Sequence, residues 1–326
     1  MPATPNPAPP DHSGPDHPGP DRPGLDHPSP DPPAPDLPAA DPPAPHRPAR
    51  ALADFLRSRR ARLQPVDVGL PPGTRRRTRG LRREEVAGLA SISTTYYTFL
   101  EQGRDVRPSR QVLDSLGAAL RLEPAEHAHL IHLATCEPTA APVGAAAEVL
   151  APGVAALVDR LDPDPTYVTG RRFDVLAANH AARALWTDWS LLPPEERNIV
   201  WWTLVAPEAR TRLVDWEAEA VGALARFRAA ADHHPGDPAF ADLIRRLRAA
   251  GPEADAWWPR HDVSALSSGR KRLRHPVLGR LDLTHVVLQV ADRPDQKIVT
   301  FTAEPAQRER IAELVRTATR QADDPS

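Results

Sequence analysis

The chain has 326 residues, which is enough for about two domains. Its single cysteine, Cys136, excludes an intramolecular disulfide and a zinc site built from cysteines. The N-terminal residues lack the apolar core of a signal peptide, and no uncharged apolar run reaches membrane-spanning length. We therefore expect a cytoplasmic, soluble protein with no membrane partner.

The net charge of −2 is distributed unevenly. Residues 1–50 carry three Arg and seven Asp, a balance of −4, whereas residues 51–137 carry 14 Arg and 10 acidic residues, a balance of +4. A basic block between neutral or acidic regions indicates a local contact with a polyanion.

Residues 11–45 repeat in fives, with Asp at every fifth position. Because they contain almost no aromatic or β-branched residues, they cannot bury enough apolar surface to fold, and we expect residues 1–50 to be a disordered tail. The tail has two interpretations: an acidic segment that screens the basic block or engages a partner, and an inert repeat expansion, which is the commoner case.

The basic block predicts an all-α domain of five helices over residues 51–136, followed by a Pro- and Ala-rich linker over 137–149. Apolar residues at helical spacing begin near Leu52. The later helices are expected at about 82–90, 93–102, 109–121 and 124–135.

The second and third of these helices have the features of a helix-turn-helix. Ala87 and Ala90 are small where two helices would cross, Ser91 occupies the turn, and Ser93 can cap the third helix. Tyr97 and Leu100 share its inward face, which leaves four outward residues able to reach base edges: Thr94, Thr95, Tyr96 and Phe99. A plain helical hairpin with a solvated polar face is the alternative.

Arginines beside this motif favour DNA binding over the hairpin. Six of them fall within nine residues, where they can neutralise phosphates: Arg75, Arg76, Arg77, Arg79, Arg82 and Arg83. Arg83 opens the second helix and can also approach the groove.

The segment "GLRREEVAGLASISTTYYTFLEQGRDVRPS" resembles the lambda-repressor-like (XRE-type) helix-turn-helix. Among proteins with that motif, it is most similar to the MmyB-like transcription regulators. The resemblance implies base contacts from Arg83, Thr94, Thr95 and Phe99, and a phosphate contact from Arg107. It also implies an ion pair between Arg60 and Glu101. Phe99 departs from the basic or polar residue usual in the family, so the preferred base is open; a Phe can contact a thymine methyl group.

Residues 150–304 predict an α+β domain. Strands are expected on both sides of Gly170 and in "RLDLTHVVLQVA" and "KIVTFTAE", with a helical stretch over 206–231. Asn179 is expected to cap the helix that follows the second strand. A final helix and tail occupy 305–326.

All seven Trp lie between residues 186 and 258. Such a cluster is more often core than cavity wall, although Trp also lines apolar ligand cavities. The candidates for a pocket are Trp186, Trp202, Trp216, Leu224 and Phe227.

The segments "RRFDVLAANHAARALW", "ERNIVWWTLVAPEAR" and "WPRHDVSALSSGRKRLRHPVLGRLDL" are similar to the ligand-binding domain of MmyB-like regulators. This resemblance implies a PAS-like fold with a small antiparallel sheet and a non-covalent fatty-acid-like ligand. No cofactor or metal is expected, because the His-containing helix over 124–135 lacks ligands at zinc spacing.

The sequence thus indicates a multidomain transcription regulator that binds double-stranded DNA and a small-molecule ligand, with a homodimer left open. One alternative is a second domain that recruits a protein partner. An enzyme fused to a DNA-targeting domain is disfavoured, since no phosphate loop, nucleophile elbow or metal-spaced His pair is present.

Replacing Arg75, Arg76 and Arg77 by Ala should weaken binding to all duplexes to a similar degree and flatten its salt dependence, because phosphate contacts carry no sequence information. Titrations of two unrelated duplexes over a range of salt concentrations measure both effects. Unchanged affinity and salt slope would show that this loop does not lie at the DNA.

Overall fold

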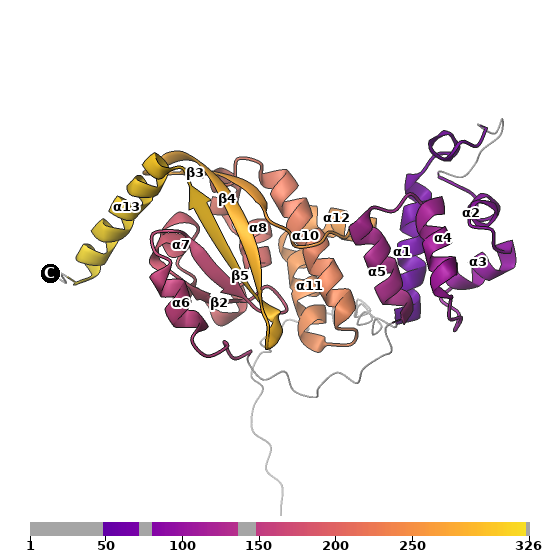
Figure 1. The fold of residues 1–326 in the computed structure, drawn as a ribbon, viewed down its shortest axis with the longest axis horizontal. Coiled ribbons are helices and arrows are strands. Elements are labelled where there is room, and N and C mark those ends of the chain that lie inside the picture. Colours follow the sequence, from indigo (N-terminus) through magenta and orange to yellow (C-terminus); the bar gives the residue numbers. More distant parts are fainter. Residues whose placement is uncertain (1–47, 72–79, 136–147, 324–326) are drawn as a thin grey trace, which may run out of the picture. The chain divides into compact units, whose positions relative to one another are not determined.

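The computed structural model describes residues 48–71, 80–135 and 148–323 (Figure 1). The expected disordered tail falls almost entirely outside these residues. So do Arg75, Arg76, Arg77 and Arg79, and nearly all of the expected linker.

The first domain is helical. Its elements are α1 (Pro48–Arg62), the 3₁₀ helix η1 (Pro65–Val68), α2 (Arg83–Leu89), α3 (Thr94–Glu101), α4 (Arg110–Ala119) and α5 (Pro124–Thr135). One apolar cluster unites the five α-helices, and at its centre Leu56, Tyr97 and Leu116 are fully buried. Within each helix the buried apolar side chains recur at helical spacing, for example Tyr97 and Leu100 in α3, so the local pattern was sufficient to predict the helices.

A tight turn joins α2 to α3. Ser91 has φ +57°, and the next amide, of Ile92, donates to the Ala87 carbonyl at 3.0 Å. A left-handed residue directly after a helix end satisfies carbonyls that the helix leaves open. Ser93 then accepts from the Tyr96 amide at 3.1 Å and caps α3, as predicted. The turn therefore fixes where α3 begins.

The carboxylate of Glu101, at the end of α3, is completely buried. Arg60 of α1 donates from Nε to Oε1 at 2.5 Å, and Arg83 of α2 donates from Nε to Oε2 at 2.6 Å. Burial alone would raise the pKa of Glu101, but the hydrogen bonds from Arg60 and Arg83 outweigh it and lower the pKa. One carboxylate thus connects the three helices.

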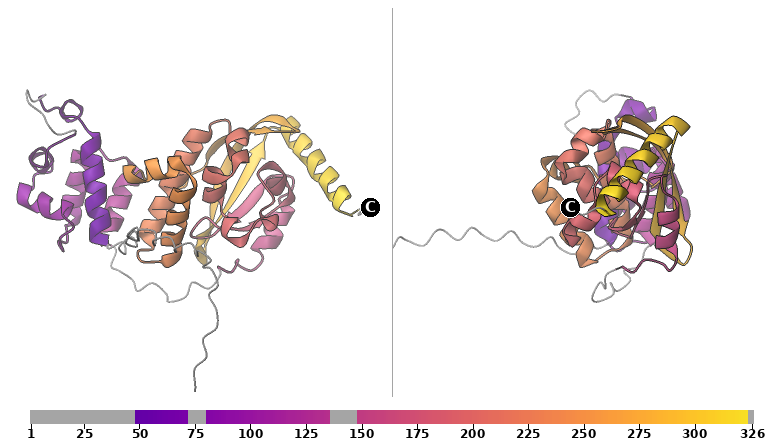
Figure 2. Two further views of the ribbon diagram at one scale, coloured as in Figure 1. Left: turned by 180° about the vertical axis from the view of Figure 1, so that it is seen from behind. Right: turned by 90° about the vertical axis from the view of Figure 1, so that its left-hand side faces the viewer.

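The second domain contains a sheet and two groups of helices (Figures 1 and 2). The strands are β1 (Thr166–Thr169), β2 (Val175–Ala178), β3 (Gly269–His275), β4 (Gly279–Val290) and β5 (Arg293–Ala303). The helices are α6 (Val154–Arg160), α7 (His180–Leu185), α8 (Ile199–Val205), α9 (Pro207–Arg212), α10 (Trp216–His233), α11 (Pro238–Ala250), α12 (Pro252–Trp257) and α13 (Pro305–Asp323). Short 3₁₀ turns lie at Trp189–Leu191, Pro194–Glu196 and Trp258–Arg260.

The sheet is antiparallel throughout, in the order β2-β1-β5-β4-β3. Because successive side chains point to opposite faces, neighbours on β1 belong to different cores. Tyr167 packs with α7, α8 and α9, whereas Val168 packs with α6 on the other face. Helices α8 and α10–α12 share a further apolar cluster. The predicted fold class, an all-α domain followed by an α+β PAS-like domain, is confirmed.

Two details differ from the sequence-based expectation. The helical stretch over 206–231 is broken, because α9 ends at Arg212 and α10 begins at Trp216. Between them Leu213 forms an isolated bridge with Leu273, and the Val214 amide donates to the Arg272 carbonyl at 3.1 Å. Their partner is β3, a strand that the sequence analysis missed.

Glu101→Ala should lower the free energy of unfolding by about 3 kcal/mol at neutral pH, since it leaves two arginines facing a buried, empty position. Glu85→Ala is the control. It removes a capping contact to the Arg82 amide at 2.6 Å and should cost about 1 kcal/mol.

The difference should depend on pH. A carboxylate with a lowered folded-state pKa stabilises the fold above its unfolded pKa of ~4.3, and that stabilisation is lost as the pH falls through the folded pKa. The gap between wild type and Glu101→Ala should therefore narrow in acid. Equal denaturation midpoints for Glu101→Ala and Glu85→Ala at neutral pH would contradict the stabilising role of the Glu101 carboxylate.

Candidate DNA-binding face and ligand cavity

The N-terminal half of α3 presents polar side chains to solvent. Thr94 and Thr95 are exposed, while Tyr97 and Leu100 are buried on the opposite face. Tyr96 and Phe99 are less exposed than the sequence analysis expected. Tyr96 packs partly against the helical core, and the guanidinium of Arg104 lies 4.3 Å from the centre of the Phe99 ring.

Arg83 stands at the start of α2 with its side chain 45% exposed. Its Nε donates to the carboxylate of Glu101, which fixes the position of the guanidinium, while the rest of the side chain reaches solvent. Arg82 is exposed and pairs with Glu84 at 3.3 Å, and Arg107 is exposed in the segment after α3. The structure thus brings Arg82, Arg83 and the α3 threonines to one helix-turn-helix.

Chemically, these groups suit nucleic acid. A threonine offers a hydroxyl that donates and accepts hydrogen bonds and a methyl group that can contact thymine. An anchored guanidinium presents planar donors that match a phosphate or a guanine edge.

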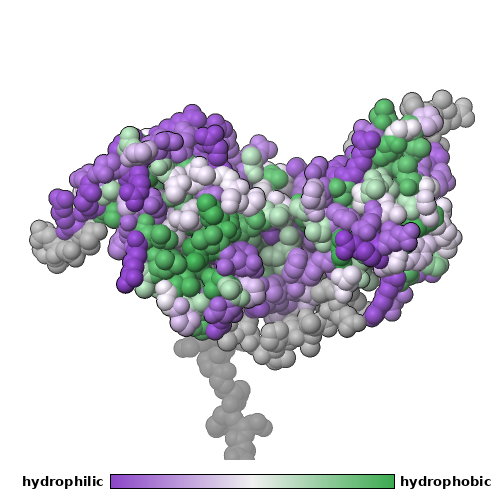
Figure 3. Space-filling view, in the orientation of Figure 1, coloured by the Kyte–Doolittle hydropathy of each residue, from purple (hydrophilic) through white to green (hydrophobic). Residues whose placement is uncertain are grey.

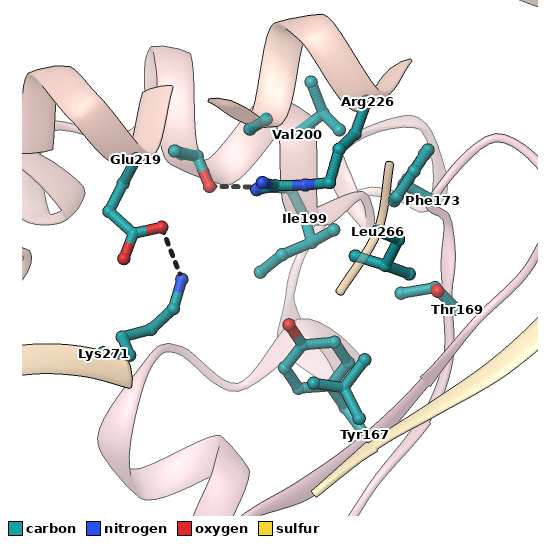
Figure 4. Close-up of a pocket in the computed structure, with 12 residues that line it drawn as sticks. Tyr167, Thr169, Phe173, Ile199, Val200, Glu219, Arg226, Leu266 and Lys271 are labelled. Atoms are coloured by element: carbon teal, nitrogen blue, oxygen red, sulfur yellow. Dashed lines mark hydrogen bonds and ion pairs between the residues drawn. The ribbon is translucent and has the colours of Figure 1, made fainter. Parts of the chain in front are cut away.

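In the second domain, a cavity of about 50 Å³ lies among β1, β3, β5, α8 and α10. Figure 4 shows Arg226 and Glu219 reaching into it from α10, Lys271 from β3, and the Tyr167 hydroxyl pointing toward them from β1. An adjoining cavity of about 190 Å³ shares this polar group. The lining of the first cavity is Tyr167, Thr169, Phe173, Ile199, Val200, Thr203, Glu219, Ala223, Arg226, Leu266, Lys271 and Val299.

Glu219 and Lys271 form the ion pair of the cavity, with 3.0 Å between Oε2 and Nζ. The Lys271 side chain is only 16% exposed. Burial lowers its pKa, and the neighbouring Glu219 only partly offsets that shift. Burial likewise lowers the pKa of Arg226 and raises that of the Tyr167 phenol. The cavity therefore combines poorly solvated cations with an apolar wall.

The predicted pocket residues lie elsewhere. Trp186 and Trp202 are buried in the core beside the sheet, and Leu224 and Phe227 are buried in the α8/α10–α12 cluster. Trp216 is partly buried between the two clusters and donates from Nε1 to the Thr203 carbonyl at 2.8 Å. None of the five lines either cavity.

Sequence reasoning missed the polar residues of the cavity, although one signal was present. Lys271 and Lys297 are the only lysines in the chain. In the segment "RKRLRH" the residues alternate, so that Lys271, Leu273 and His275 point inward between exposed arginines. Read as period-two alternation, this pattern would have indicated both β3 and an inward-facing lysine.

Within the described ranges no group of three or more His, Cys, Asp and Glu side chains could hold a metal ion. The lining of the cavity offers two cationic side chains, one carboxylate and hydroxyl groups beside apolar side chains.

Glu219→Gln should lower the free energy of unfolding by ~1–3 kcal/mol near pH 7, because it leaves the Lys271 ammonium without its carboxylate. Glu219 raises the folded pKa of Lys271, so its removal shifts that pKa further below the value of ~10.4 in the unfolded chain. The variant should therefore recover stability relative to wild type as the pH rises from the folded pKa of Lys271 in the variant to its folded pKa in wild type, because over that range only the folded variant has lost the proton.

The matched control is Glu217→Gln, an exposed position on the same helix, which should change little. Denaturant titrations at several pH values measure both variants. A deficit in Glu219→Gln that stays constant with pH would contradict the burial of a charged lysine.

Comparison with known families assigns both domains. Residues 51–130 match a helix-turn-helix domain, and residues 150–319, just over half of the chain, match the MmyB-like transcription regulator ligand binding domain. No match was found among curated proteins. In the described part of the chain, no helix has the length and apolar character needed to cross a membrane. The chain belongs to the MmyB-like transcription regulators, a family of DNA-binding regulators and not of enzymes.

Proposed function

We propose that the chain is a sequence-specific regulator whose C-terminal domain senses a small apolar or fatty-acid-like ligand. The observation that carries this proposal is the pairing of an exposed α3 with a domain that encloses a partly cationic cavity. The first feature supplies a surface for DNA, and the second supplies a site whose occupancy can change.

For DNA we propose two classes of contact. Base contacts come from Arg83, Thr94, Thr95, Tyr96 and Phe99. Phosphate contacts come from Arg75, Arg76, Arg77, Arg79, Arg82 and Arg107. The exposure of the α3 threonines and the anchored Arg83 support this division, because base reading needs outward groups of fixed position.

We further propose that the protein acts in the cytoplasm as a homodimer, with DNA-binding and ligand-binding domains at 51–136 and 150–304. One recognition helix reads only a few base pairs, and two-fold-related half-sites extend the sequence that is read.

For the ligand, the mixed lining of the cavity supports an amphipathic acid. Arg226 and Lys271 suit its anionic group, and Phe173, Ile199 and Val200 suit its apolar part. Regulation requires in addition that the ligand bind the DNA-competent and DNA-incompetent states unequally, since equal binding shifts no equilibrium.

A second candidate function is recruitment of a protein partner by the C-terminal domain. Val286 and Leu288 of β4 are 40% and 49% exposed, and Figure 3 shows apolar side chains gathered on this domain. Exposed apolar surface of this kind is used in protein contacts.

Operator affinity of the full-length protein, measured with and without saturating ligand, separates ligand sensing from partner recruitment. Ligand binding that leaves operator affinity unchanged favours the partner.

Replacing Thr94 and Thr95 together by Ala should reduce the preference for operator over unrelated DNA by about tenfold or more, because base contacts carry the sequence information. The salt slope should stay the same, since no phosphate contact is removed. Footprinting on the protein's own promoter supplies the operator, and salt-dependent titrations supply both quantities.

Thr135→Ala is the matched control. It is an exposed helical threonine of the same domain that donates to the Ile131 carbonyl at 2.9 Å. An operator preference that survives loss of Thr94 and Thr95 would remove α3 from base recognition.

A further inference from the structure

Partly buried side chains give the cavity of the second domain more positive charge than negative. Arg226 and Lys271 line both parts of it, and Glu219 is the only acidic residue in either lining. Glu219 is committed to Lys271 at 3.0 Å. The partly buried guanidinium of Arg226 has lost part of its hydration, and an anion that joins it would offset that loss. The cavity therefore favours one negative charge.

The hydroxyl group of Thr169 lies on another side of the same cavity. Thr169 is 1% exposed, and within the described residues its Oγ1 has no hydrogen-bond partner. Figure 4 places Thr169 and Phe173 on the side away from Glu219 and Lys271. A buried hydroxyl without a partner loses its hydration without replacement. It is therefore suited to a hydrogen bond from something inside the cavity.

The wall beside Thr169 is held in a strained conformation. Phe173 has φ +66°, in the left-handed region that a bulky residue seldom adopts. Its amide donates to the Gly170 carbonyl at 3.0 Å, and its carbonyl accepts from the Ile199 amide at 3.0 Å. These bonds keep the ring in the cavity lining. Strain of this kind persists where the surroundings fix it and is concentrated at ligand sites.

The size of the cavity limits what can enter. The two parts measure about 50 and 190 Å³. Both lie below the ~300 Å³ at which sites for drug-sized ligands begin. A ligand that fits without rebuilding the domain is short, with only a small apolar body between its polar ends.

We propose that this cavity binds a compact monocarboxylic acid that carries a hydroxyl group at its far end. The carboxylate lies at Arg226 and Lys271, the apolar body packs against Phe173 and Ile199, and the hydroxyl bonds to Thr169. This inference rests on the proposed ligand-sensing function and narrows its ligand from acids of any chain length to compact hydroxy acids.

The test uses the full-length protein and four probes in calorimetric and thermal-shift titrations at up to millimolar concentration. 4-Hydroxybenzoate has both polar ends, benzoate lacks the hydroxyl, and 4-hydroxybenzamide lacks the charge. Palmitate has the charge and a long chain. We expect 4-hydroxybenzoate to bind most tightly and to raise the melting temperature by mass action.

Variants of the lining residues test which side chain binds the carboxylate of the ligand and which binds its hydroxyl. Arg226→Gln should weaken 4-hydroxybenzoate about tenfold to a hundredfold, the effect of losing a hydrogen bond to a charged group. Thr169→Val, which keeps the shape of the side chain, should make 4-hydroxybenzoate and benzoate bind equally. Arg245→Gln, at an exposed position on α11, is the control and should change neither affinity.

Three outcomes would overturn the proposal: no binding of either compact acid, 4-hydroxybenzamide binding as well as 4-hydroxybenzoate, or palmitate binding more tightly than both. Insensitivity to Thr169→Val would overturn the assignment of the far end. Operator affinity is measured on the same samples without ligand. A protein that binds its operator but no compact acid contradicts this inference alone, whereas loss of operator binding contradicts the proposed function.

Discussion

A charge taken out of water must be matched by a neighbour, and this requirement organises the helical domain. Glu101 is fully buried and is matched by Arg60 and Arg83. Glu126 of α5 is matched by Arg62, at 2.7 Å. Because Arg60 and Arg62 both belong to α1, the first helix is tied by charge to α3 and to α5. Apolar packing alone would tolerate some sliding of these helices, whereas a carboxylate shared by fixed donors does not.

The same requirement explains how the side chain of Arg83 is placed. Its inner nitrogen completes the buried network, and its outer end reaches solvent beside α3. The guanidinium thus loses little further freedom when it meets a partner. In the second domain the matching is incomplete, since one carboxylate faces two cations in the cavity. The helical domain thus matches its buried carboxylates with arginines, whereas the cavity of the α+β domain keeps a partly buried cation in excess.

The sequence predicted those features that depend on neighbouring residues. The helices around Tyr97 and Leu116 follow from helical spacing, and the caps at Ser93 and Asn179 follow from short polar side chains at helix starts. Asn179 accepts from the Ala182 amide at 3.0 Å, as predicted.

What the sequence could not supply depends on distant contacts. The exposed arginines of β3 made its alternation of inward and outward side chains hard to recognise. The break in the helix after Arg212 depends on the bridge between Leu213 and Leu273, which are far apart in the sequence. The cavity draws Tyr167, Arg226 and Lys271 from three elements separated by long stretches of chain, so no local pattern joins them. The tryptophans attracted notice because they are large, and large apolar groups fill cores more readily than they leave space.

The position of β3 has a consequence for how copies of the chain behave when they are crowded. β3 is an outer strand of the sheet, and such strands can pair with the outer strand of another molecule and begin aggregation. Here Leu213 and Val214 occupy part of its free side, and Arg270 and Arg274 place like charges along its exposed face, while Arg272 is paired with Asp215. A second copy approaching this strand would meet electrostatic repulsion and an edge that is already partly paired. The arginines that made β3 hard to predict from the sequence therefore oppose edge-to-edge pairing of two copies at high protein concentration.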